Sequence, residues 1–285
     1  MGEIVKKWLF AWIVLIAFCG EPALAAGSYT PISLTQPLKV SRGKIAPQSP
    51  DAAYFTHDES CRFLVSDQGW TENDCAAVEN ILAAPAPGID SAVIYKPVSE
   101  GYIRFEDWSG SKEQIDEIWT GFVEAMKDQS QRLNKKLVPQ GWLVHPTLDK
   151  NKAYMYYALI IDWEGRKSVN IKATLFDRAG YVPFVIVPED SAVTAAQAQA
   201  LLTRFLSSYT SDPDASYFDF KQGDKVAAIG ALGVLATLMG VKVAKVAAVG
   251  LFAVALAFGK KLIFLLIVLP FLALRRLFRR RDRIM

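Results

Sequence analysis

Apolar residues are distributed very unevenly along the chain, and the longest apolar run lies near its C-terminal end. From Val226 to Leu274 the only charged residues are lysines, at positions 242, 245, 260 and 261. An uninterrupted apolar stretch longer than about 18 residues is typical of a membrane-spanning segment. The pattern therefore predicts C-terminal apolar membrane helices within residues 225–275. One crossing, from Val226 to about Phe258, is favoured over a two-crossing hairpin, which stays open.

Both ends of the chain carry topology signals. Lys6 and Lys7 precede an apolar run from Trp8 to Phe18 and an Ala23-Leu24-Ala25 site, a pattern typical of a secretory signal peptide over residues 1–26. An uncleaved N-terminal anchor remains an alternative. Arginines cluster after Leu274, and the positive-inside rule makes residues 276–285 a basic cytoplasmic tail. Residues 27–224 are then expected on the periplasmic side.

Between the two ends, residues 27–50 are rich in proline, glycine and polar residues, which predicts a flexible arm. The next segment predicts a mixture of short elements. They are a strand at Arg62–Val65, a helix from Thr71 to Ala83, and strands at Ser91–Tyr95 and Gly101–Phe105.

A regular amphipathic pattern follows. Ser111 and Gln114 form a capping-box pattern, and the helix that they start has an apolar stripe at helical spacing, made by Ile115, Ile118, Trp119, Phe122, Val123 and Met126. Four strands separated by polar turns predict an antiparallel meander, at 137–144, 154–162, 168–176 and 181–187. A helix over 193–206 closes the domain. Residues 51–224 are thus expected to form an α+β domain, with helices packed on one face of an antiparallel sheet.

Charge and cysteine content limit the kinds of partner and site that this protein is expected to have. The formal net charge of +3 comes from the C-terminal end, so the middle of the chain is acidic, which argues against nucleic acid as a partner. Once Cys19 leaves with the signal peptide, two cysteines remain, and an even number in an exported chain favours a Cys61–Cys75 disulfide. The two histidines have no metal-ligand spacing, and no metal or cofactor is expected.

Catalytic motifs are absent: the chain has no G-x-S-x-G, no Walker loop and no dinucleotide glycine pattern. The candidates that remain are His145, four residues from Asp149, and Asp107 in the loop after Gly101–Phe105. A histidine with a nearby carboxylate can act as a general base. The structural reading, in which Pro146 ends a strand and Asp149 makes a turn, is favoured over catalysis.

A set of glycines, aromatic residues and charged residues resembles a known family. It comprises Gly101, Tyr102, Asp107, Gly141, Trp142, Pro146, Asp149, Asn170, Arg178, Gly180, the run Tyr217–Phe220, Asp224, Lys225 and Gly230. In this order they resemble the uncharacterised, membrane-anchored bacterial family called domain of unknown function 2167, from about Cys61 to the C-terminus. Ile171, Thr174 and Ile229 depart from its pattern. The resemblance implies an architecture and no reaction.

These observations lead to two functional hypotheses. The first is a non-enzymatic interaction or structural protein of the bacterial envelope, anchored in the inner membrane with its main domain in the periplasm. Its expected partners are the lipid bilayer, an unknown envelope protein, and further copies of itself through a small-residue helix face made by Gly230, Ala231, Gly233, Ala236 and Gly240. The alternative is a hydrolase-like envelope enzyme that uses Asp107, His145 or Asp149.

Overall fold

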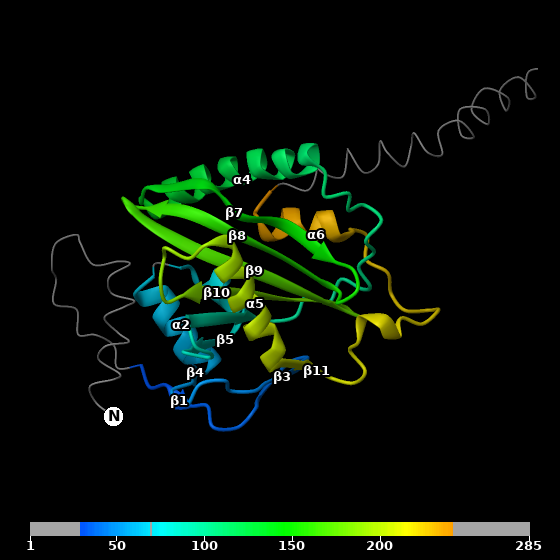
Figure 1. Cartoon of the computed structure of the whole chain (residues 1–285), viewed down its shortest axis with the longest axis horizontal. Helices are drawn as coiled ribbons and strands as arrows, with labels where there is room; N and C mark the ends of the chain where they lie inside the picture. The colour runs from blue at the N-terminus through cyan, green and yellow to red at the C-terminus, as the bar shows by residue number, and fades with distance from the viewer. Residues whose placement is uncertain (1–28, 69, 242–285) are drawn as a thin grey trace, which may run out of the picture.

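A computed structural model describes residues 29–68 and 70–241. Its centre is an eight-stranded antiparallel sheet in the order β1-β4-β5-β6-β10-β9-β8-β7 (Figure 1). In chain order the strands are β1 (Ile32–Ser33), β4 (Ala53–Phe55), β5 (Val78–Ala83), β6 (Ile89–Tyr95), β7 (Leu137–Asp149), β8 (Tyr154–Trp163), β9 (Arg166–Asp177) and β10 (Gly180–Pro188). A second sheet has the order β11-β3-β2, with β2 at Leu38–Val40, β3 at Gly43–Ile45 and β11 at Tyr209–Ser211.

The four strands of the predicted meander are present as β7 to β10, and they are longer than the pattern indicated. Alternation marks the register: Ile171 and Ala173 on β9 are buried, while Lys172 between them points to the other face. Glu164 and Gly165 join β8 to β9 and both have positive φ, as the favoured two-residue hairpin turn requires. Strand β7 contains register shifts near Gly141 and His145, where it departs from regular pairing with β8.

Helices cover both faces of the sheet. Helix α5 (Ala195–Ser208) packs Leu202 and Phe205 on the face that includes Ile171 and Phe184. Helices α4 (Lys112–Leu133) and α6 (Ala231–Leu238) pack on the opposite face, around Tyr157. Two shorter helices, α2 (His57–Ser66) and α3 (Glu72–Ala76), lie beside β5 on that same side. The expected single helical layer is therefore wrong, and the large antiparallel sheet dominates the fold.

Two local predictions in the first part of the domain are also wrong. Arg62–Val65 belongs to α2, and the helix that Thr71 caps ends at Ala76 instead of Ala83. The rest of the predicted helix is strand β5, which pairs with β4 and β6. Its side chains at positions 78, 81 and 82 are almost fully buried. A strand that is buried on both faces shows no alternation, so periodicity could not separate it from the end of a helix. A third prediction, the strand at Gly101–Phe105, is wrong as well, because among the described residues this segment forms a single bridge, from Tyr102 to Val226.

The amphipathic helix α4 begins where its pattern predicted. Ser111 is its N-cap, and the Ser111 Oγ accepts a hydrogen bond from the Gln114 backbone N–H. The Gln114 side chain accepts from the backbone of Ser109 and Gly110 instead of that of Ser111, so the reciprocal half of a capping box is not made. Ile115, Ile118, Phe122 and Met126 are buried, while Val123 at the edge of the stripe is 40% exposed.

The prediction of a membrane helix that starts at Val226 is wrong. Residues 231–238 form the short helix α6, and the six residues from Ala231 to Ala236 are buried inside the domain. Gly240 lies next to Ala125 of α4, and Val241 packs against Gly121, so small residues here allow close contact within the domain. None of the helices in residues 29–68 and 70–241 has the length and apolar character needed to cross a bilayer.

The arm predicted over residues 27–50 contains three strands from residue 29 onwards. Val40 and Ile45, on β2 and β3, are buried in the core beneath α5. The predicted signal peptide (1–26), the rest of the predicted transmembrane region (242–275) and the basic tail (276–285) lie outside the described residues.

The predicted disulfide is present. Cys61 of α2 and Cys75 of α3 are bonded, with their Cα atoms 5.3 Å apart, a normal separation for a disulfide. The bond joins the two short helices that lie beside β5.

Candidate functional site

Many of the residues that carry the family resemblance meet at one end of the sheet, where two loop segments lie side by side. The Tyr102 N–H donates to the Lys225 carbonyl over 2.7 Å, and the Ala227 N–H donates to the Tyr102 carbonyl over 3.0 Å. The Gly101 N–H donates to the Ala179 carbonyl, which ties the pair of segments to the β9–β10 turn. Residues separated by more than 120 positions along the chain thus form one continuous backbone network, which we call the motif junction.

An ion pair fastens the β9–β10 turn to the second segment of the motif junction. The Arg178 guanidinium donates two hydrogen bonds of 2.6 Å to the two carboxylate oxygens of Asp224. Asp224 also accepts from the Lys221 backbone N–H over 2.7 Å. The Arg178 hydrogen bond is the main reason why the pKa of Asp224 falls to about 2.

We expect Arg178→Ala to raise the pKa of Asp224 towards that of an ordinary aspartate. Because the folded pKa is depressed, the contribution of this carboxylate to stability is complete above the unfolded pKa of about 4 and is lost as the pH falls through about 2. The pKa of Asp224 is measured directly from carboxyl ¹³C chemical shifts recorded as a function of pH. In Arg178→Lys the charge is kept and the bidentate geometry is lost. The Asp224 pKa of this variant should therefore lie between that of the wild-type protein and that of Arg178→Ala. An unchanged Asp224 pKa in Arg178→Ala would contradict the pairing.

A second ion pair lies beside the first and comes from the predicted flexible arm. The Arg42 guanidinium pairs with the Asp177 carboxylate and also donates to the Ser99 hydroxyl over 2.6 Å. Asp177 accepts in addition from the Ala179 backbone N–H. Both side chains are mostly buried, with 15% of Arg42 and 7% of Asp177 exposed. Sequence analysis missed Arg42, because an arginine in a polar, proline-rich segment carries no signal of a distant partner.

The two ion pairs border a polar pocket of about 490 Å³. Its lining includes Arg42, Ser99, Asp177, Arg178, Asp224 and Lys225. Most of these charges are already paired within the protein, and the Lys225 ammonium lies 3.5 Å from the Ser99 carbonyl. The pocket can therefore offer hydrogen bonds to a small polar molecule, but it has little free charge with which to hold an ion.

Asp107 has a structural role at the start of α6. The N-cap position, Gly230, has no side chain with which to cap the helix, and the Asp107 carboxylate takes its place by accepting from the Leu232 N–H over 3.1 Å. Burial raises the pKa of Asp107, and the backbone N–H groups of residues 231–233 oppose that shift. A carboxylate at this position stabilises the helix by accepting from free N–H groups and by favourable interaction with the helix dipole.

Gly230 leaves the space that this carboxylate fills. A Cβ at position 230 would lie 2.3 Å from the Asp107 Cγ. We therefore expect Gly230→Ala to lower the free energy of unfolding by about 2 kcal/mol, and Asp107→Ala to lower it by about 1–2 kcal/mol through loss of the cap. The two changes disturb one interaction, so the double variant should lose less than the sum of the single variants. Urea unfolding of the four proteins measures this, and strictly additive losses would contradict it.

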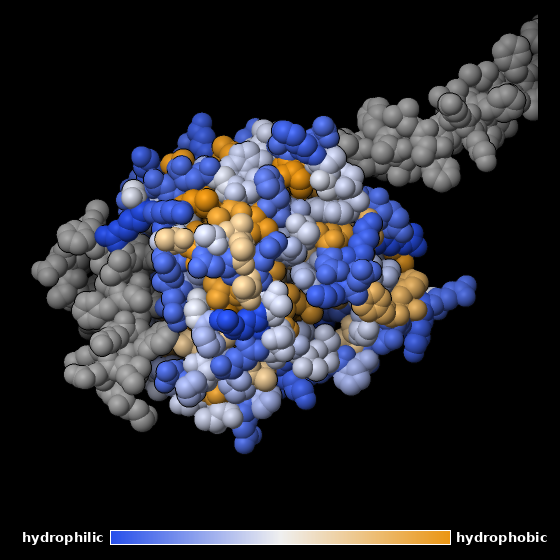
Figure 2. Space-filling view, in the orientation of Figure 1, coloured by the Kyte–Doolittle hydropathy of each residue, from blue (hydrophilic) through white to orange (hydrophobic). Residues whose placement is uncertain are grey.

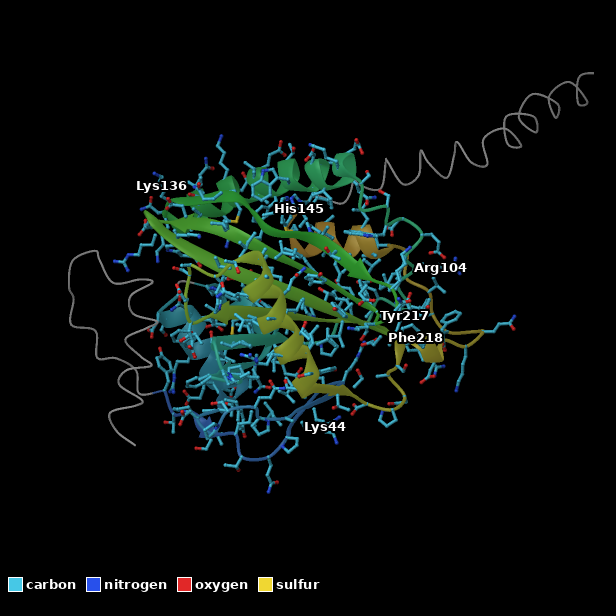
Figure 3. The ribbon with its side chains drawn as sticks, in the orientation of Figure 1. Lys44, Arg104, Lys136, His145, Tyr217 and Phe218 are labelled. Carbon is cyan, nitrogen blue, oxygen red and sulfur yellow. A yellow bond between two sulfur atoms is a disulfide. The ribbon has the colours of Figure 1, made fainter. Side chains whose placement is uncertain are left out.

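The other candidate catalytic residues lie elsewhere. Figure 3 shows His145 on β7 near α4, far from Arg104, Tyr217 and Phe218 at the motif junction. His145 is exposed, and its ring lies 6.2 Å from that of Trp142. Asp149 accepts from the backbone N–H groups of Asn151 and Lys152, and so closes the β7–β8 turn. Within the described residues, no hydrogen bond or ion pair joins Asp107, His145 and Asp149.

The remaining residues that carry the family resemblance lie on other parts of the sheet. Gly141, Trp142 and Pro146 are on the irregular strand β7, and the Asn170 amide donates to the Ser168 hydroxyl on β9. No group of three His, Cys, Asp or Glu side chains in the described part of the chain is placed to hold a metal ion. The structure thus brings together the motif residues near 101, 178, 180 and 224, but not the proposed catalytic set.

An ordered aromatic turn completes the motif junction. Tyr217, in the 3-10 turn η1 (Tyr217–Asp219), is buried, and its ring stacks on Tyr102 and Phe105 at centroid distances of 4.5 and 4.7 Å. Its hydroxyl donates to the Ile103 carbonyl over 2.8 Å. The next residue, Phe218, is directed outward and is 62% exposed. Figure 2 shows hydrophobic surface at this end of the molecule, with hydrophilic residues around it.

Comparisons with known proteins identify a family without assigning a function. A family model described as "Protein of unknown function (DUF2167)" matches residues 35–271. No curated protein matches the chain. Among solved structures, the solution structure of cyanobacterial PsbP (CyanoP) from Synechocystis sp. PCC 6803 is 10% identical and has a TM-score of 0.35 over 69% of this chain and 99% of that chain. At this level of similarity, neither fold nor function is transferred.

Proposed function

Because the chain belongs to the DUF2167 family of proteins of unknown function, we propose its role from its geometry: a domain of the bacterial cell envelope that binds another envelope protein through the motif junction. The observation that carries this proposal is an exposed apolar surface on an ordered frame. Phe218, Phe220 and Val226 are 62%, 38% and 37% exposed. The Phe220 ring lies 4.3 Å from that of Tyr102, which pairs with Val226. We call these three residues the aromatic surface.

The aromatic surface has the properties of a protein-binding site. Aromatic residues are enriched in protein interfaces and often contribute most of the binding energy. The Arg178–Asp224 pair and the stacked Tyr217 hold the surrounding segments in place, so little ordering is needed on binding. Charged groups of the adjacent pocket supply the polar rim that such interfaces usually have.

The cellular location is part of the same proposal. The disulfide supports an oxidising compartment such as the periplasm, since cytosolic proteins rarely keep such bonds. The signal-like start and the apolar, arginine-flanked residues beyond Val241 support attachment to the lipid bilayer of the inner membrane. The hydrolase-like alternative loses its motivation, because Asp107 caps a helix and Asp149 closes a turn. Its test remains whether His145→Ala and Asp149→Ala variants complement a deletion strain.

Site-specific photocrosslinking of the full chain in living cells tests the interaction. A benzophenone amino acid at position 218 should give one discrete crosslinked protein. The matched control is position 123 on α4, which is 40% exposed and also apolar but lies outside the motif junction. Phe218→Ser should remove complementation without changing the melting temperature, because the side chain is mostly in solvent. Crosslinks from position 218 to lipid alone, to a second copy of the chain alone, or in the same pattern as from position 123 would overturn the proposal.

A further inference from the structure

The polar pocket at the motif junction deepens from an exposed rim to a buried floor. At the rim, Ser99 and Lys225 are exposed. Arg42 and Arg178 on the walls are half-buried, and Asp177 at the floor is only 5% exposed. The lining includes parts of the β2–β3 turn, the β9–β10 turn and the loop after β11. Its volume of about 490 Å³ lies within the range of small-molecule sites, roughly 300–1,000 Å³.

The charges of this pocket compensate one another. Both arginines of the lining are paired with aspartates. A further aspartate, Asp212, pairs with Lys39 over 2.7 Å. The charged residues that remain in the lining, Asp214 and Lys225, have opposite signs and are both exposed. An ion at the floor would therefore lose its hydration without gaining an unpaired counter-charge, which favours a neutral ligand.

The same ion pairs leave hydrogen-bond donors and acceptors available. A guanidinium group carries several N–H donors in a fixed fork. Arg178 uses Nε and Nη2 for Asp224, which leaves its Nη1 without an acceptor among the described residues. Arg42 uses Nη1 and Nη2 for Asp177 and Ser99, which leaves its Nε. On the acceptor side, Asp224 Oδ1 and Asp177 Oδ2 each accept from one nitrogen only, so each keeps a free lone pair.

We propose that the pocket binds a neutral polyhydroxylated molecule, the ring of a sugar, between the Arg42–Asp177 and Arg178–Asp224 pairs. A hydroxyl group both donates and accepts, so neighbouring hydroxyls on a ring match walls that present donors and acceptors side by side. Hydrogen bonds to charged groups are stronger than those between neutral groups. The ion pairs also hold these groups in place before the ligand arrives, which lowers the entropic cost of binding. The alanine methyl groups of the lining provide apolar contacts for the C–H groups of the ring.

Saturation-transfer difference NMR on the full chain tests this site with small probes. The neutral probes are glucose, galactose, mannose and N-acetylglucosamine. Glucuronate and glucosamine, at a pH where both are charged, share the same ring, and cyclohexanol carries a single hydroxyl. At least one neutral sugar should bind saturably and about tenfold or more tightly than the charged probes, because an added charge has no counter-charge in the pocket. Cyclohexanol should not bind, since it cannot satisfy the donors and acceptors together.

A blocking variant shows whether the sugar lies in this pocket. Ala179 lines the pocket and is exposed, and only its backbone N–H is bonded to Asp177, so Ala179→Phe should fill the space without breaking either ion pair. It should weaken sugar binding about tenfold or more and leave the melting temperature unchanged. The matched control is Ala192→Phe, at an exposed alanine outside the lining. Arg178→Lys keeps the charge and has fewer donors, so it should weaken binding as well.

Phe218→Ser separates this site from the aromatic surface. Phe218 is not part of the pocket lining, so this variant should bind sugar like the wild-type protein even though it loses the proposed protein contact. The sugar site is overturned if no neutral sugar binds, if the charged probes bind as tightly, or if Ala179→Phe and Ala192→Phe bind sugar equally well. A disaccharide of the sugar that binds then distinguishes the source. Tighter binding of the disaccharide indicates the end of a longer glycan, and its loss indicates a free sugar.

Discussion

Replacing Gly180 by alanine is expected to lower the free energy of unfolding by about 3–5 kcal/mol, the largest effect of any substitution considered for this protein. Gly180 has φ +153°, and a Cβ there would lie 1.8 Å from the Val98 carbonyl oxygen. That oxygen accepts from the Tyr181 N–H over 3.1 Å, so the Val98 segment cannot move away without loss of this hydrogen bond. Urea unfolding monitored by tryptophan fluorescence and far-UV circular dichroism measures the loss.

Gly141 provides a matched control for this experiment. Its φ is +152°, nearly the same as that of Gly180, but no atom lies within 4 Å of a Cβ built there. Gly141→Ala should therefore show only the backbone strain, about 1–2 kcal/mol. The difference between the two variants isolates the close approach of the β9–β10 turn to the Val98 segment. Equal losses in both variants would mean that the two backbones are not in contact.

Removal of the disulfide is expected to have the second largest effect. Cys61 and Cys75 are 14 positions apart, and the chain-entropy relation assigns about 3 kcal/mol to a loop of this size. Cys61→Ser/Cys75→Ser should lose about that amount, and so should the reduced wild-type protein. Hydrogen exchange should show the loss of protection first in α2 and α3, because the bond joins these two short helices beside β5.

Reduction of the wild-type protein controls for the serine substitutions. If the stability falls in the double variant alone, the buried Cys75 site does not tolerate serine, and the crosslink itself contributes little. Intact mass before and after reduction and alkylation shows whether the bond forms in the exported protein. Two thiols that react without reductant would contradict the disulfide and also the proposed oxidising compartment.

Membrane insertion and core packing are alternatives for one apolar segment, and composition did not distinguish them. The sequence of residues 231–238 is typical of the beginning of a membrane span, yet six consecutive residues of α6 are buried within the domain. The features that decide this outcome are distant in sequence. They are the Asp107 carboxylate that caps α6, and Gly121 of α4, which leaves space for Val241.

In the candidate site, too, some residues could be identified from the sequence and others only from the tertiary structure. Motif residues near positions 101, 178, 180 and 224 could be selected from the sequence because they carry the resemblance to the DUF2167 family. Arg42 could not be selected, since it is an ordinary residue type in an ordinary segment. The importance of Arg42 comes from Asp177, which lies more than 130 positions away along the chain.

Short-range patterns were sufficient for the long strands β8 to β10, for helices α4 and α5, and for the Cys61–Cys75 pair. In each case the determining interactions lie within one element or its adjacent turn: the two-residue alternation, the positive-φ turn at Glu164-Gly165, the caps at Ser111 and Thr194, and a short cysteine spacing. The tertiary structure alone decided the placement of helices on both faces, the burial of α6 and the motif junction. The physical reason is that apolar composition states how much surface must leave water, but not whether lipid or the protein's own sheet will cover it.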